Sequence, residues 1–148
     1  MHDIGYWSRS WVFGVPLIAL TVVVHVIGLS LIRVAFARAF GRRDMRRAAS
    51  TLRFAVVMGA ATALVTLLHV VQGAIWAAAY VLLGALPDPH EAMLYSLGAM
   101  TAYGHAAVFL APAWQMLGAL EALNGLILFG LTTAFLYGMI QQAWPGHE

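Results

Sequence analysis

Two histidines are the side chains in this sequence whose type and placement most directly suggest chemistry. His25 and His69 each lie near the middle of a long apolar run. Histidines on two membrane helices can hold a haem iron between them through their ring nitrogens. A small haem-binding membrane redox subunit is therefore one hypothesis. The other is structural, because the sequence has no second histidine pair and no haem motif.

Glu121 is the next candidate, because it is an acid about two turns inside another apolar run. An ionisable group at such a position is energetically expensive and usually faces protein or water. Asn124 lies one turn further along the same helix face. Glu121 could brace a neighbouring segment through a hydrogen bond, line a polar path, or pair with Asn124 as a protonated buried acid. We expect bracing.

The composition indicates what must position these side chains. Of 148 residues, 62% are hydrophobic and 9% are charged, and the mean hydropathy is +0.83. Soluble domains carry about 25% charged residues, so a soluble globular fold is excluded. The lack of cysteine excludes a disulfide scaffold, a thiolate metal site and a cysteine nucleophile. Because a membrane helix takes about 20 apolar residues, there is room for three or four.

Three apolar runs, at 11–36, 54–86 and 112–144, are predicted to be membrane helices. Seven of the eight arginines lie within 33–53, and the net charge is +2. This pattern favours membrane orientation over nucleic-acid binding. Because short arginine-rich loops stay in the cytoplasm, we expect the N-terminus outside and the C-terminus in the cytoplasm, in the cell (plasma or inner) membrane.

A shorter helix is predicted between the second and third runs. Pro87 stops the second helix, Asp88 is a good N-cap, and Pro89 suits the first helical position. The helix so begun, 89–101, reaches about 18 Å against roughly 30 Å of hydrocarbon, so it is too short to span. We therefore expect it to re-enter on the outer side. Irregular backbone at membrane depth then indicates a pore or a substrate cavity.

Two segments around this short helix carry a resemblance to a known family. Residues 92–110 are AMLYSLGAMTAYGHAAVFL, and residues 114–130 are WQMLGALEALNGLILFG. The first is similar to the pore helix and filter of the potassium-channel superfamily, commonly ALYFSLVTFTTLGYGDVVL, and the second to its inner helix. From 54 to 142 the chain therefore resembles a small bacterial two-helix pore-loop channel, here with one additional N-terminal helix.

The resemblance assigns the selectivity filter and ion pathway to Thr101, Ala102, Tyr103, Gly104, His105 and Ala106. Ala106 stands where the family has a glycine, whose positive φ costs other residues roughly 1–2 kcal/mol. Ala107 replaces an aspartate. His105, in place of a tyrosine, would form a ring of four imidazoles that either responds to pH or packs as the tyrosine would. Potassium selectivity is therefore not expected to carry over intact.

The predicted fold class is an all-α membrane protein with three transmembrane helices plus a re-entrant pore helix and filter loop, assembled as a homotetramer. Its parts are an N-terminal helix (1–37), a basic cytoplasmic linker (38–53) and a pore domain (54–148). We expect passive permeation of monovalent cations, with K+ implied by the resemblance. We expect no catalysis, no cofactor or resident metal, and no nucleic acid or soluble substrate as partner. A non-conducting structural or regulatory protein on the same scaffold is an alternative.

The remaining site predictions concern polar residues that each have a structural alternative. Asp88 and Glu91 would add acidic charge at the outer mouth, or would only cap the short helix. Glu121 and Asn124 would brace the filter. Thr132 and Thr133 would line an inner cavity, or would only pack helices. Gly125, Gly130 and Gly138 are either hinges or places of close helix packing, which we favour.

Overall fold

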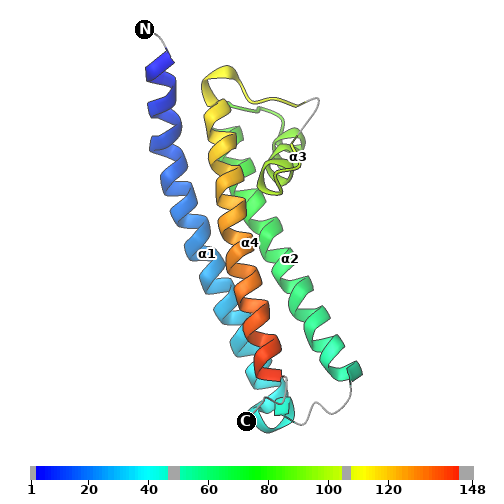
Figure 1. Cartoon of the computed structure of the whole chain (residues 1–148). Coiled ribbons are helices and arrows are strands. Elements are labelled where there is room, and N and C mark those ends of the chain that lie inside the picture. The colour runs from blue at the N-terminus through cyan, green and yellow to red at the C-terminus, as the bar shows by residue number, and fades with distance from the viewer. Residues whose placement is uncertain (1–2, 47–50, 105–107, 144–148) are drawn as a thin grey trace.

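The computed structural model describes residues 3–46, 51–104 and 108–143, which are mostly helical with no strand among them. Figure 1 shows the long helices beside one another, with a short helix against one end of the group. The helices are α1 (Asp3–Arg46), α2 (Thr51–Leu82), α3 (Pro89–Met100), the 3-10 turn η1 (Pro112–Trp114) and α4 (Gln115–Ala143). The predicted all-α class is confirmed for these residues.

Each long helix is long and apolar enough to cross a membrane. The apolar segments are Ser8–Arg38, Phe54–Leu82 and Pro112–Gln142, in agreement with the three predicted runs. The predicted linker 38–53 is partly helical, because α1 continues to Arg46. Arginine and alanine, which dominate that stretch, are good helix formers, so the helix does not end with the apolar run.

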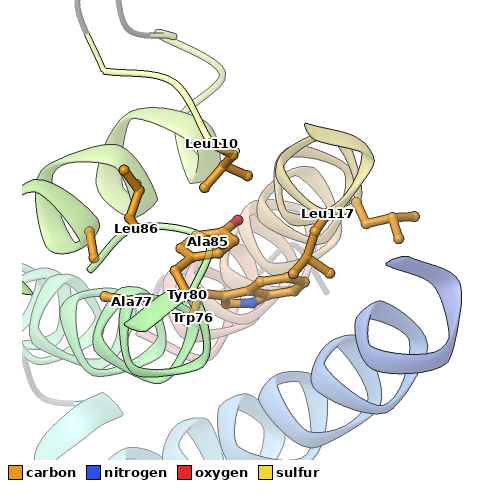
Figure 2. Close-up of a cluster of buried hydrophobic side chains, with 9 residues drawn as sticks. Trp76, Ala77, Tyr80, Ala85, Leu86, Leu110 and Leu117 are labelled. Atoms are coloured by element: carbon orange, nitrogen blue, oxygen red, sulfur yellow. The ribbon is translucent and has the colours of Figure 1, made fainter. Parts of the chain in front are cut away.

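Two apolar clusters hold the helices together, one toward each end. The cluster beside α3 contains Trp76 and Tyr80 of α2 with Leu117 of α4, as Figure 2 shows. The other joins the second half of α1 to the first half of α2, and its buried members are Leu29, Ile32, Phe36, Ala61 and Val65. The polar side chains that join the helices lie between these clusters.

The short helix α3 extends along α2 and α4. Ser96 Oγ of α3 lies 2.8 Å from the carbonyl oxygen of Gly73, which is nine residues before the end of α2 at Leu82. At 1.5 Å per residue this contact is about 14 Å from that end. The backbone of Met100, at the end of α3, lies against Gly125 of α4.

The segments before and after α3 lie at the same end of the bundle. Before α3, Ala85 offers its carbonyl oxygen to the N–H of Ala111, which comes after α3, at 3.2 Å. Figure 1 shows α3 beside the ends of α2 and α4 that lie toward the start of α1. Asp88 begins the helix as predicted, because its side chain accepts a hydrogen bond from the Glu91 N–H at 2.8 Å and Pro89 is the first helical residue.

Gly125 is a place of close packing, whereas a Cβ at Gly130 or Gly138 would have no neighbour within 4 Å. A Cβ at Gly125 would overlap the carbonyl group of Met100, which is backbone and cannot turn away. Gly125→Ala is therefore expected to lower the free energy of unfolding by about 1–3 kcal/mol.

The matched control is Gly130→Ala on the same helix, which is expected to raise stability by about 0.5–1 kcal/mol through helix propensity. Thermal unfolding of both variants in detergent, followed by circular dichroism, checks this. Equal effects of the two substitutions would contradict the close contact between α3 and α4.

Candidate functional site

Glu121 is the centre of a polar contact that joins three helices. Its side chain is fully buried on α4. The Tyr80 hydroxyl of α2 donates a hydrogen bond to Glu121 Oε2 at 2.5 Å. Glu121 Oε1 contacts Ser96 Oγ of α3. Of the roles considered for Glu121, the structure therefore shows a hydrogen bond to the neighbouring short helix.

Counting hydrogens indicates that this carboxyl group is neutral. Ser96 Oγ lies against both the Gly73 carbonyl oxygen and Glu121 Oε1, but a serine hydroxyl has one hydrogen. The Gly73 carbonyl can only accept, whereas a carboxyl group buried in apolar surroundings is expected to be protonated and can donate. We therefore assign the Ser96 hydrogen to Gly73. A protonated Glu121 can then donate from Oε1 to Ser96 Oγ and accept from Tyr80 at Oε2. In this arrangement all four groups have a hydrogen-bond partner, as buried polar groups require.

Asn124 does not pair with Glu121 and does not contact α3 through a hydrogen bond. Its amide nitrogen donates to Thr21 Oγ1 of α1 at 2.8 Å. Three residues advance a helix by less than a full turn, so Asn124 faces α1 while Glu121 faces α2 and α3. The two residues predicted to act together therefore belong to two separate contacts.

A second polar cluster joins α1, α2 and α4 deeper in the bundle. His25 Nε2 and His69 Nε2 each lie 3.1 Å from the hydroxyl oxygen of Thr132. Gln72 Nε2 donates to His25 Nδ1 at 2.8 Å. All four side chains are buried. Thr132 therefore lies between helices of one chain, whereas Thr133 is exposed and its hydroxyl donates to the Phe129 carbonyl oxygen at 2.9 Å.

The geometry of the two histidines does not fit a haem. Their ring centroids are 5.1 Å apart and the rings are tilted by 42°, so the imidazoles are in near contact. Both Nε2 atoms are directed at one threonine hydroxyl, and a macrocycle between them would have to displace Thr132. Within the described ranges no group of three or more His, Cys, Asp or Glu residues could hold a metal ion.

The first residues of the predicted filter close the end of α3. The N–H of Ala102 donates to the Ala99 carbonyl at 2.9 Å, and that of Tyr103 to the Gly98 carbonyl at 3.0 Å. This pair of bonds is a Schellman motif, whose residue after the helix has a positive φ and is usually glycine. Here that residue is Ala102, with φ 55°.

At Ala102 the left-handed conformation costs about 1–2 kcal/mol, a backbone strain that the sequence did not predict at this position. Gly104 also has a positive φ, of 74°. Thr101 Oγ1 donates to the Leu97 carbonyl oxygen at 2.9 Å, so this hydroxyl also serves the end of the helix. His105 and Ala106 lie outside the described residues. Asp88 and Glu91 are both exposed.

Several residues in these contacts were not predicted from the sequence. Tyr80 and Ser96 bind Glu121, and Gln72 and Thr21 join the deeper cluster. One signal could have found those on α2, because His69, Gln72, Trp76 and Tyr80 recur every three or four residues. That spacing places their polar groups on one face of an otherwise apolar helix.

Comparisons of this chain with protein-family models, with curated proteins and with solved structures found no match.

The neutral state of Glu121 predicts which substitution the site tolerates. In Glu121→Gln the amide can donate to Ser96 and its oxygen can accept from Tyr80, so we expect a loss of less than about 1 kcal/mol. Glu121→Leu leaves the buried Tyr80 hydroxyl without an acceptor and is expected to cost about 1–3 kcal/mol or more. Thermal unfolding in detergent compares the two variants. Equal destabilisation by both substitutions would contradict a neutral carboxyl.

Proposed function

We propose that this chain is one subunit of a membrane channel for monovalent cations, in which α2, α3 and α4 of several copies surround a central path. The observation that carries the proposal is the position of α3. This helix is too short to span, yet it is fixed beside α2 and α4 by Ser96 and Glu121. By the resemblance to the potassium-channel superfamily, the assembly is a homotetramer and the permeant ion is K+.

The segment after α3 supports a path at this position. The described part of 101–111 is irregular apart from the cap at its start, and it leads back to η1. Irregular backbone at membrane depth occurs where it is buried in protein or lines water. In addition, the carboxyl end of a helix carries a partial negative charge, which favours a nearby cation.

Exposed apolar side chains fit a chain that is covered by lipid and by further copies of itself. Tyr103, within the predicted filter, is 88% exposed. The helix α4 also leaves Leu123, Leu126 and Ile127 exposed. One chain supplies only one wall of a path, so the copies must bring these surfaces together. Because short arginine-rich loops stay in the cytoplasm, the proposal has the arginine-rich stretch after the first span on the cytoplasmic side and the N-terminus outside.

A non-conducting protein on the same scaffold is the second candidate, and one observation favours it. The N–H groups of Ala102, Tyr103 and Gly104 donate to the carbonyl oxygens of Gly98 and Ala99, so this segment folds back on α3 as a helix cap. A potassium filter instead turns successive carbonyl groups of this segment toward the ion. The cap therefore gives the path a different lining, or closes it.

The lack of cysteine allows a direct test of the topology. Single cysteines would replace Pro87, Phe109 and Gln142, which are exposed in the protomer. In sealed vesicles of known orientation, a membrane-impermeant thiol reagent is expected to label the first two positions from the outer side and the third from the inner side. Labelling of positions 87 and 109 from opposite sides would mean that α3 crosses the membrane, which would refute the re-entrant arrangement.

Ion flux from liposomes tests the function itself. Protein of verified oligomeric state is reconstituted, and efflux down K+ and Na+ gradients is compared with that of empty liposomes. We expect cation flux with weak preference, and more K+ preference in the double variant Ala106→Gly, Ala107→Asp, which restores the family's glycine and aspartate at these two positions. An absence of flux from both proteins, in oligomers that pass the topology test, would reject the channel and leave the non-conducting scaffold.

A further inference from the structure

We propose that His25, Thr132 and His69 form a proton-binding site between α1, α2 and α4, which takes up one proton on acidification and holds it on His25 against Gln72. The site lies inside a single chain, away from the proposed path between subunits. It therefore does not depend on whether the protein conducts ions.

The hydrogen-bond partners fix where the hydrogens lie when both imidazoles are neutral. The Gln72 amide nitrogen donates to His25 Nδ1, so His25 carries its hydrogen on Nε2 and donates it to Thr132. The single hydrogen of the Thr132 hydroxyl is then directed to His69 Nε2. His69 must therefore carry its own hydrogen on Nδ1. Four side chains form one directional chain from Gln72 to His69.

This series of hydrogen bonds contains a site for an additional proton. It would bind His25 Nδ1, which is the acceptor at the start of the chain. Gln72 Oε1 is buried and has no hydrogen-bond partner among the described residues. Rotation of the Gln72 amide by half a turn would bring this oxygen to His25, where it would accept from the new N–H group. The rotation gives up the Gln72 Nε2 contacts with His25 Nδ1 and, at 3.4 Å, with the Thr21 carbonyl oxygen, and replaces them with a charge-assisted hydrogen bond to the otherwise unpaired Oε1.

His69, at the far end of this series of hydrogen bonds, can also carry the positive charge. A proton passed on through Thr132 would bind His69 Nε2, because Nδ1 already carries a hydrogen and is buried without a partner among the described residues. The ring of Phe129 is stacked on the His69 ring, with centroids 4.5 Å apart and planes 24° apart. An aromatic face attracts a cation, so charge that passes through Thr132 to His69 is stabilised there.

The surroundings limit the site to one proton. Among the described residues, the titratable groups that face the cluster are the two histidines themselves, one from α1 and one from α2. The side chains of α4 that meet these two helices here, Thr132 and Asn124, do not titrate. Glu121 is occupied with Tyr80 and Ser96. With ring centroids 5.1 Å apart and no acid between them, both imidazoles cannot be charged together.

Nitrogen NMR of histidine-labelled protein in detergent micelles tests this proposal, because the ring nitrogen shifts report tautomer and charge separately. At neutral pH we expect the Nε2–H form for His25 and the Nδ1–H form for His69. On titration from pH 8 to pH 4, one of the two is expected to become an imidazolium. Exposed His90 on α3 supplies the signal of a histidine in water.

Substitution of Gln72 separates proton binding from simple packing. Gln72→Leu removes the acceptor for the new N–H group, and the imidazolium is then expected only at a pH about one unit lower or more. Gln141→Leu, at an exposed glutamine near the end of α4, is the matched control and is expected to leave the titration unchanged.

Three outcomes would overturn the proposal. The first is that both histidines stay neutral down to pH 4 in folded protein. The second is that both histidines become charged together. The third is the same tautomer in both rings at neutral pH, which would exclude the directional chain. All three are measured on the unsubstituted protein, so the proposal is decided even if Gln72→Leu does not fold.

Discussion

The contact of Glu121 with Tyr80 and Ser96 is the interaction on which the arrangement of α2, α3 and α4 depends. α3 is a helix of 12 residues, too short to be stable alone in water and too short to span a bilayer. A neutral carboxyl bonded on both sides joins it to α2 and α4 without a buried charge. Breaking that contact would leave polar groups unpaired in an apolar region, which is costly.

Close approach of backbones complements this polar contact. Gly73 allows Ser96 of α3 to reach the backbone of α2, and Gly125 allows the end of α3 to lie against α4. Between apolar helices in lipid the hydrophobic effect contributes little, so association depends on packing of small residues and on hydrogen bonds across helices. The same physics explains the hydrogen bonds of Thr21 with Asn124 and of His25 with Thr132, which join α1 to α4.

The two polar contacts differ in how completely they are satisfied. In the Glu121 contact each donor is bonded to an acceptor, which favours a rigid arrangement with a neutral carboxyl group. Around His25 several buried atoms have no partner among the described residues, including Gln72 Oε1, His69 Nδ1 and Asn124 Oδ1. A satisfied network rigidifies, whereas an incompletely satisfied one has capacity for a further ligand or proton. The first contact therefore fits a positioning role, and the second fits a binding role.

The sequence by itself determined the elements. Apolar runs of sufficient length predicted the three long helices, and Asp88 with Pro89 predicted where α3 begins, because both signals are local. Which side chains bond to one another was decided only by the tertiary structure. Helix spacing placed Asn124 near Glu121, but the rotation of α4 directs them to different helices. The positive φ of Ala102 was not predicted, because it arises where the end of α3 is capped against its own last turn. Periodicity identifies a helix face, and only the packed neighbours determine what that face contacts.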